Sequence, residues 1–249
     1  MRLRVIYKGG AALFAAACLV VVLILPERAG AIVGRSVDGA KWQNQVVMVL
    51  SRSGSRAGFC SGVVLKPNII LTAAHCVSNA SDSRIYLPGQ PLIPASRIAR
   101  HPGFHADAAR TRSRSIDLAL IETADALPAG FTAPAFATST RDEIGTPFEI
   151  AGYGVSQESD AKTSGMLRVG HVTLRAPLSS VLLWLDDPRY ETGACTGDSG
   201  GPVFTRDGRL AAIIAFAEGA GSQRCGKLTQ AVLIAPHREW IEAIISSWR

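Results

Sequence analysis

The sequence predicts an all-β protein made of two packed antiparallel β-barrels, followed by one α-helix at the C-terminal end. Two observations lead to this prediction. Short apolar runs separated by Gly, Pro, Ser and Asn recur along most of the 249 residues, and such runs are typical of strands. Helical periodicity is convincing only after Pro236, where apolar residues repeat at helical spacing. Many short strands with a single terminal helix fit two antiparallel barrels.

The expected elements follow from these patterns in chain order. Residues 132–146 are rich in Thr, Ala and Pro and are the expected crossing between the barrels. The first barrel is therefore expected at about residues 32–135, the second at about 136–234 and the helix at about 236–248. Nine apolar runs are assigned as strands: 46–51, 60–65, 69–72, 117–122, 147–152, 166–174, 202–205, 210–216 and 228–234. The apolar face of the helix would carry Trp240, Ile241, Ile244, Ile245 and Trp248.

The first 31 residues are expected to be an export signal that is removed. A basic start leads into an apolar run over residues 11–25, Pro26 ends this run, and Ala29-Gly30-Ala31 offers small residues for signal peptidase. A retained membrane anchor is the less favoured alternative, because a run of about 15 residues is shorter than the roughly 20 that span a bilayer. We therefore expect a secreted or periplasmic domain over residues 32–249, without stable membrane insertion after processing.

Composition argues against a nucleic-acid partner. The chain has a formal net charge of +6, but residues 1–31 hold four basic residues and one acidic residue, so the remaining 218 residues carry about +3. Arg110, Arg112 and Arg114 cluster just before Asp117. The preferred interpretation is a solvated surface loop, which could still bias the substrate side chains accepted nearby.

Cysteine usage indicates an oxidising compartment. Cys18 falls in the expected signal, which leaves Cys60, Cys76, Cys195 and Cys225. An even number of cysteines in an exported chain implies two disulfides, and four cysteines allow three connectivities. No Cys-x-x-Cys pair or histidine cluster suggests a metal site, and we expect neither a metal nor a cofactor.

One motif suggests a serine nucleophile. The chain reads Cys195-Thr196-Gly197-Asp198-Ser199-Gly200-Gly201-Pro202. A serine hydroxyl is a poor nucleophile until a base takes its proton and backbone N–H groups stabilise the resulting oxyanion. Gly197 and Gly200 leave room for a substrate, and Gly197 can turn its N–H inward. The motif is informative only if the other parts of such a site exist elsewhere.

The other parts do exist, and they come in an informative order. His75 lies in Leu71-Thr72-Ala73-Ala74-His75-Cys76, and Asp117 opens an apolar strand in Ser115-Ile116-Asp117-Leu118-Ala119-Leu120-Ile121. The order His, Asp, Ser is that of chymotrypsin and differs from the orders in subtilisin and the α/β-hydrolases. From residue 32 to the C-terminal helix, the chain resembles the trypsin/chymotrypsin-like serine peptidases.

The resemblance implies a chymotrypsin-like fold of two six-stranded barrels, with the active site in the cleft between them. Ser199 would attack the scissile carbonyl carbon, His75 would accept and return the proton, and Asp117 would orient His75. The N–H groups of Gly197 and Ser199 would form the oxyanion hole. The remaining histidines lack motif context and are expected to be surface or packing residues: His101, His105, His171 and His237.

The resemblance also selects the disulfides and argues against calcium. It implies the pairs Cys60–Cys76, beside the histidine, and Cys195–Cys225, at the wall of the substrate pocket. Relatives that bind calcium do so with acidic residues in the loop after the histidine. Between Cys76 and His101 the only acidic residue of this chain is Asp82, so we expect no bound calcium.

Ile32-Val33-Gly34-Arg35 is similar to the N-terminus that the family exposes on activation. In the family, the freed isoleucine ammonium pairs with the aspartate before the nucleophile, here Asp198. Because Ala31 ends the expected signal, we hypothesise that signal peptidase itself produces the active N-terminus. The alternative is that cleavage occurs elsewhere and a second protease trims the chain.

The pocket for the side chain before the cut is predicted to be narrow and uncharged. Trypsin-like relatives carry aspartate at its base, where this chain has Gly193 followed by Ala194. The substrate-pairing strand Ala215-Phe216-Ala217 stands where the family usually has Ser-Trp-Gly, so Ala217 adds a methyl group. Ala215 lacks a hydroxyl that supports the triad aspartate in relatives. Counting back from the C-terminal helix places Thr229 at another wall position and predicts further narrowing.

The sequence therefore indicates a secreted serine endopeptidase. It would act on protein or peptide substrates through an acyl-enzyme, after small or medium apolar residues and not with trypsin-like specificity. We expect a monomer. The main alternative is a catalytically silent binding protein on the same scaffold. An α/β-hydrolase esterase with Asp207 and His237 is disfavoured, because the roughly 50 residues after Ser199 read mainly as strands.

Overall fold

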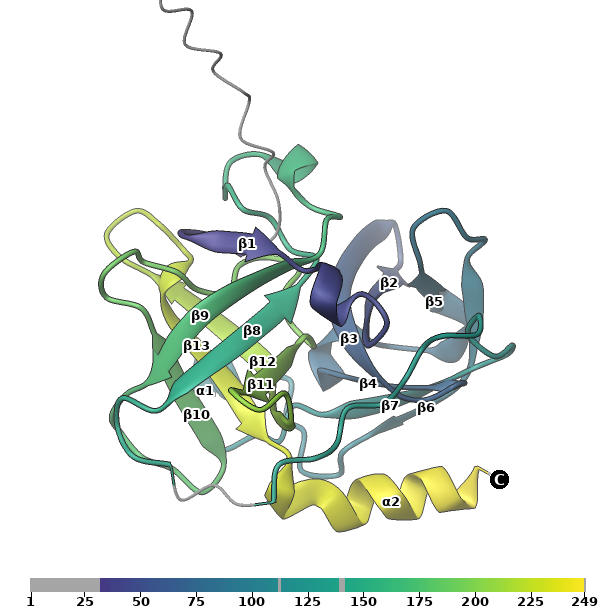
Figure 1. Ribbon diagram of the computed structural model, residues 1–249. Helices are drawn as coiled ribbons and strands as arrows, with labels where there is room; N and C mark the ends of the chain where they lie inside the picture. Colours follow the sequence, from purple (N-terminus) through teal and green to yellow (C-terminus); the bar gives the residue numbers. More distant parts are fainter. Residues whose placement is uncertain (1–31, 112, 139–141, 249) are drawn as a thin grey trace, which may run out of the picture.

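The computed structural model describes residues 32–248, except residue 112 and residues 139–141 (Figure 1). The export signal expected at 1–31, one arginine of the cluster before Asp117 and the middle of the expected crossing lie outside the described residues. Within them, no helix is long and apolar enough to cross a membrane.

Thirteen strands and two α-helices make up the described part of the chain. The strands are β1 (Ser36–Asp38), β2 (Val46–Ser53), β3 (Arg56–Lys66), β4 (Ile69–Thr72), β5 (Ser83–Tyr86), β6 (Ile93–Arg100), β7 (Ala119–Thr123), β8 (Pro147–Gly152), β9 (Arg168–Leu174), β10 (Leu182–Asp186), β11 (Pro202–Thr205), β12 (Leu210–Gly219) and β13 (Gly226–Leu233). The helices are α1 (Ala108–Thr111) and α2 (Arg238–Ser247).

The strands close into two antiparallel barrels of six strands each. The first barrel runs β2-β3-β4-β7-β6-β5. The second contains β9, β10, β13, β12, β11 and β8, and it closes because β8 pairs with β9. Figure 1 shows the two barrels side by side, with α2 lying below them. The predicted fold class, with its terminal helix, is confirmed.

Three apolar clusters hold this arrangement together. One fills the first barrel with residues such as Val47, Ile70 and Ile121, and another fills the second with residues such as Ile150 and Leu185. The third joins the barrels: Val46, Val63, Leu71, Leu118, Ala151, Phe204, Ile213 and Val232 belong to it. Burying each of its larger side chains contributes about 1.5–3 kcal/mol. The cluster therefore fixes how the two barrels face each other.

The C-terminal helix also packs against this joining cluster. Ile241 is fully buried, and the other members of the predicted apolar face are partly buried against the same core: Trp240, Ile244, Ile245 and Trp248. The helix begins at Arg238 after a 3₁₀ turn (Ala235–His237). The predicted face is thus the one that the structure buries.

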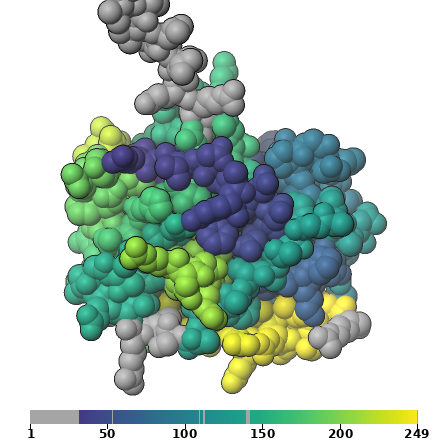
Figure 2. Space-filling view, viewed as in Figure 1, coloured from purple at the N-terminus to yellow at the C-terminus, as the bar shows by residue number. Residues whose placement is uncertain are grey.

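The beginning of the first barrel differs from the prediction. We expected this barrel from about residue 32, but β1 pairs with β9 of the second barrel, and the first barrel begins with β2 at Val46. Val33 also pairs with Gly193 in an isolated bridge. Figure 2 shows the segment after residue 31, in dark purple, crossing the surface. The N-terminal residues belong to the second barrel because Ile32 is buried in its core.

Candidate active site

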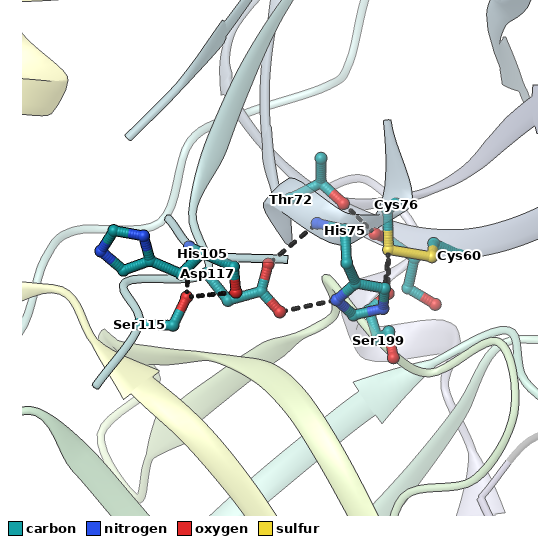
Figure 3. Close-up of polar contacts among 9 residues, drawn as sticks. Cys60, Thr72, His75, Cys76, His105, Ser115, Asp117 and Ser199 are labelled. Atoms are coloured by element: carbon teal, nitrogen blue, oxygen red, sulfur yellow. Dashed lines mark hydrogen bonds and ion pairs between the residues drawn. A yellow bond between two sulfur atoms is a disulfide. The ribbon is translucent and has the colours of Figure 1, made fainter. Parts of the chain in front are cut away.

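The first barrel positions His75 and Asp117 against each other. His75 lies in a 3₁₀ turn (Ala74–Cys76) directly after β4, and Asp117 lies just before β7, which pairs with β4. The His75 backbone N–H donates to Asp117 Oδ1 at 2.9 Å, and Nδ1 lies 2.6 Å from Oδ2 (Figure 3). A carboxylate there favours the tautomer with the proton on Nδ1. Nε2 is then left free to accept a proton.

A disulfide anchors the histidine turn to the first barrel. Cys60 in β3 is bonded to Cys76, with 6.1 Å between the Cα atoms. The Cys76 sulfur lies 3.6 Å from His75 Nε2 and 3.8 Å from the Ser199 carbonyl oxygen. Nε2 and Ser199 are therefore neighbours, as Figure 3 shows. The other bond joins Cys195 to Cys225, so both pairs are those that the resemblance implied.

Ser199 comes from the loop before β11 of the second barrel. Its side chain is partly exposed, and its carbonyl oxygen accepts the Ser61 N–H at 2.8 Å. Among the described residues, no hydrogen bond joins its hydroxyl to His75 Nε2. In free enzymes such bonds are often long and tighten when substrate binds. The structure thus brings all three predicted triad residues together across the junction of the barrels.

The loop carries the backbone geometry of an oxyanion hole. The Thr196 carbonyl oxygen accepts the Val155 N–H at 2.9 Å, so the Gly197 N–H of the same planar peptide points the opposite way. Gly197 has φ +96°, and a Cβ there would run into the Phe59 ring. Neither the Gly197 nor the Ser199 N–H has an acceptor within the described residues. Both donors are available to a substrate oxygen.

Asp198 is fully buried behind this loop. Oδ1 accepts the Gly154 N–H at 2.8 Å, and Oδ2 accepts the Cys195 N–H at 2.9 Å. Burial raises the pKa of the Asp198 carboxyl to about 7, and backbone hydrogen bonds, including one from Ile32, oppose this rise. Ile32 is fully buried with φ +65°, a left-handed conformation that strains a β-branched residue. The predicted partners of the N-terminal pair are therefore in contact.

Several of the residues predicted to line the pocket contact one another. A Cβ at Gly193 would lie 3.0 Å from Gly226 Cα, so the backbone of Gly226 lies against Gly193, the residue predicted at the pocket base. Thr229 is fully buried, and its hydroxyl oxygen accepts the Ala194 N–H at 2.9 Å. Thr229 also stands opposite Ala217 of β12, and its narrowing of the pocket stays a prediction.

The three residues predicted to pair with substrate lie in one strand. Ala215, Phe216 and Ala217 lie in β12, where Phe216 stands opposite Gln230 and Ala217 stands opposite Thr229 of β13. Phe216 is 46% exposed, which leaves its ring accessible to a bound peptide. Sequence reasoning missed Gly226 and Ser61. Both directly follow a disulfide cysteine, and this is the local signal that could have marked them.

Among the residues that the structure describes, two groups of side chains have metal-like spacing: Cys60, His75 and Cys76, and Glu158, Cys195 and Cys225. The four sulfurs are bonded in the two disulfides, so they offer no thiolate to an ion. Glu158 accepts the backbone N–H groups of Arg224 and Cys225. Its carboxylate therefore serves to hold the loop before β13.

Two further histidines lie away from the nucleophile. His237 is buried, its ring centroid lies 4.7 Å from that of His101, and the Trp240 ring lies 4.8 Å from His101. Burial, together with the charges of His101 and Arg114, lowers the pKa of His237 to about 4. His237 is thus a packing residue, as predicted.

Comparisons with known proteins identify the family. The family model for trypsin matches residues 31–241. Trypsin epsilon of Drosophila erecta is 27% identical over 88% of this chain and 89% of its own length. Human kallikrein-7 is 27% identical over 68% of this chain and 69% of its own.

A solved structure agrees at the level of the fold. Neuropsin, a serine protease expressed in the limbic system of mouse brain, aligns with a TM-score of 0.68 and 19% identity. The alignment covers 85% of this chain and 98% of neuropsin. The family match spans both barrels and the segments that carry His75, Asp117 and Ser199. The chain therefore belongs to the trypsin family and is a trypsin-like serine peptidase.

Proposed function

We propose that this chain is a secreted endopeptidase that uses Ser199, His75 and Asp117 as a catalytic triad. The observation that carries the proposal is the double hydrogen bond from His75 to Asp117, at 2.6 Å and 2.9 Å. It fixes the ring with Nε2 directed toward the nucleophile loop. A histidine held in this way is suited to act as a general base.

The reaction follows from the roles of these three side chains. Ser199 Oγ bonds to the scissile carbonyl carbon while its proton passes to His75 Nε2. The resulting imidazolium, stabilised by Asp117, gives the proton to the leaving nitrogen as the C–N bond breaks. Water then attacks the acyl-enzyme by the same steps and frees Ser199. The N–H groups of Gly197 and Ser199 hold the negative oxygen in both halves.

The active form is proposed to begin at Ile32. A freed ammonium would replace the peptide N–H that now donates to Asp198. Because Asp198 is fully buried, an adjacent positive charge would stabilise its carboxylate strongly. We propose that removal of an export signal at 1–31 produces this end directly. The two disulfides support an oxidising destination, either extracellular or periplasmic.

The preferred residue before the cut is proposed to be small or medium-sized and apolar. Gly193 supplies no carboxylate to pair with Lys or Arg. The Cα of Gly226 lies against Gly193, and Ala217 adds a methyl group on the side of β12. A methylene more or less in such a pocket changes discrimination by only about 1–3 kcal/mol. The preference is therefore expected to be graded.

Cleavage-site profiling tests the proposal. The chain beginning at Ile32 is incubated with a diverse peptide library, beside a Ser199→Ala control, and new ends are identified by mass spectrometry. Cuts after Ala, Val, Thr or Leu that disappear in the control are the expected result. Cuts after Lys or Arg would keep the peptidase and contradict the pocket assignment. Absence of Ser199-dependent cuts would contradict the proposed activity.

Labelling separates the peptidase from a silent binding protein on the same scaffold. A fluorophosphonate reacts only with a serine that a nearby base activates. We expect labelling of the wild-type chain and none of Ser199→Ala or His75→Ala. A wild-type chain that stays unlabelled while its fold is intact would favour the binding protein.

A further inference from the structure

Ser61 in β3 connects the first barrel to the nucleophile loop. It is fully buried, and its N–H donates to the Ser199 carbonyl oxygen at 2.8 Å. Its hydroxyl donates to the Gly197 carbonyl oxygen at 2.9 Å and accepts the Tyr153 N–H at 2.9 Å. Its own carbonyl oxygen accepts the Thr72 hydroxyl at 2.8 Å. Every polar group of Ser61 is therefore paired, which fixes its position.

The partners of Ser61 flank the residues that bind the oxyanion. The peptide between Gly197 and Asp198 is held on one side by the Asp198 N–H, which donates to the Cys195 carbonyl oxygen at 3.0 Å. The Ser61 hydroxyl holds the other side. Gly197 lacks a side chain and has φ +96°, so its backbone has more freedom to turn than any other residue would have. Without the Ser61 hydroxyl, the Gly197 carbonyl oxygen would lose its hydrogen bond, and the peptide between Gly197 and Asp198 could turn more easily.

The same hydroxyl reaches the segment that supports Asp198. Tyr153 donates to Ser61, and the next residue, Gly154, donates to Asp198 Oδ1 at 2.8 Å. One hydroxyl group thus lies between the loop that carries Ser199 and the segment that holds the carboxylate behind it. No apolar side chain of the same size could pair both the carbonyl oxygen and the N–H.

We propose that Ser61 is a positioning residue for the oxyanion hole. Its hydroxyl keeps the Gly197 carbonyl oxygen turned toward β3, and the N–H groups of Gly197 and Ser199 then stay directed at the reacting carbonyl. Ser61 does not touch the substrate. The inference rests on the proposed function of Ser199 and adds a first-barrel residue to the part of the site that the second barrel supplies.

The test separates turnover from binding. Loss of a direct oxyanion-hole donor lowers kcat by about 10²–10³-fold, so loss of an indirect support should cost roughly tenfold. We expect Ser61→Ala in the chain beginning at Ile32 to lower kcat by about that factor, with KM changed less than twofold. A peptide aldehyde, whose tetrahedral adduct places an oxygen in the hole, should lose affinity by a similar factor.

Ser83 provides a matched control. It is also fully buried in the first barrel, and its hydroxyl donates to the Asn79 carbonyl oxygen at 2.8 Å and not to the nucleophile loop. Ser83→Ala removes the same group from the same kind of environment and should leave kcat and aldehyde affinity unchanged. Rates are divided by the concentration of active sites from fluorophosphonate titration. Ser61→Gly deletes the same hydroxyl and replaces Ser61→Ala if that variant does not fold.

The outcomes distinguish this inference from the proposed function. If the wild-type chain cleaves peptides through Ser199 while Ser61→Ala keeps kcat and aldehyde affinity within twofold, the positioning role is wrong and the peptidase stands. An equal loss in Ser83→Ala would show a general stability effect and overturn it as well. If the wild-type chain has no Ser199-dependent activity, both proposals fail.

Discussion

The two barrels contribute to the site in different ways. The first barrel supplies His75 and Asp117, which meet through side chains at the ends of two paired strands, and the His75 side chain is 41% exposed. The second barrel supplies Ser199 and the backbone of Gly197, which depend on hydrogen bonds to Ser61 and Val155. One half is fixed by its own barrel, whereas the other depends on distant parts of the chain.

The electrostatics of the two halves differ in the same sense. Asp117 is partly exposed and accepts two hydrogen bonds from His75. Asp198 is fully buried, and burial raises its pKa to about 7. A carboxylate with this pKa is poorly stabilised until a cation approaches it. In the proposed mechanism, the first barrel therefore carries proton transfer, and the buried Asp198 of the second barrel controls the site.

The largest expected effect comes from a substitution in the part of the site that the first barrel supplies. Asp117→Asn keeps the shape of the side chain but favours the wrong His75 tautomer. We expect kcat on a cleaved peptide to fall by about 10⁴-fold, the loss known for this change in a Ser-His-Asp triad. Asp107→Asn, at an exposed aspartate paired with Arg110, should have no effect. A loss of less than tenfold in Asp117→Asn would show that His75 is oriented by other groups.

The next largest effect comes from a change in the part of the site that the second barrel supplies, with His75 and Asp117 left unchanged. One alanine added before Ile32 removes the ammonium from the Asp198 site. Breaking a buried ion pair costs about 3–5 kcal/mol, so kcat/KM should fall by at least roughly a hundredfold. The double change with Asp198→Asn is the control, because without the carboxylate the extension should matter much less. Equal activity of the extended and unextended chains would refute the role of Ile32.

A third effect concerns the stability of the folded state. It compares the chain that begins at Ile32 with the chain that carries one extra alanine before Ile32. When Ile32 is blocked, Asp198 binds a proton more readily in the folded state, with a pKa of about 7 against 3.8 when unfolded. The folded state then holds more protons between about pH 4 and pH 7, so its stability falls as the pH rises through this window. A free ammonium favours the carboxylate and removes this loss.

The measurement is the difference in Tm between the two chains, both carrying Ser199→Ala to prevent self-cleavage. We expect the chain beginning at Ile32 to gain on the extended chain as the pH rises from 4 to 7. A difference that stays constant across this range would mean that the Ile32 ammonium and Asp198 do not interact.

The halves also differed in how far sequence could predict them. His75, Asp117 and Ser199 lie in short local motifs, and their meeting followed from the resemblance. The support from Ser61 was not predicted, because it joins residues 136 positions apart through one hydroxyl. Thr229 stands opposite Ala217 in the paired strands β12 and β13, and its part in the pocket stays a prediction.

The strands show the same limit. The nine apolar runs all overlap with strands, but β1, β5, β6 and β10 were not expected. The eight residues of β6 include two arginines and are mostly exposed or half-buried, so no apolar run marks this strand. β5 has four residues that alternate between buried and half-buried, which is too short for a clear period. Pairing with neighbours in the barrel, rather than local composition, makes these segments strands.

The smallest expected effect tests whether a buried base behaves oppositely to the buried acid. His237 is 8% exposed, its Nε2 has no partner among the described residues, and burial lowers its pKa to about 4. The unfolded state therefore binds more protons between about pH 4 and pH 6.5, so stability is lost as the pH falls through this window. His237→Phe keeps an aromatic ring against His101 without a titrating group. We expect the variant to lose about 2–4 °C less in Tm than the wild type between pH 6.5 and pH 4, the shift that about 1 kcal/mol gives in a chain of this size.

His105→Phe, at an exposed position, is the control, and its Tm should change with pH as that of the wild type does. Parallel curves for wild type and His237→Phe would mean that His237 stays uncharged in both states or is solvated when folded, and the acid sensitivity would then lie elsewhere.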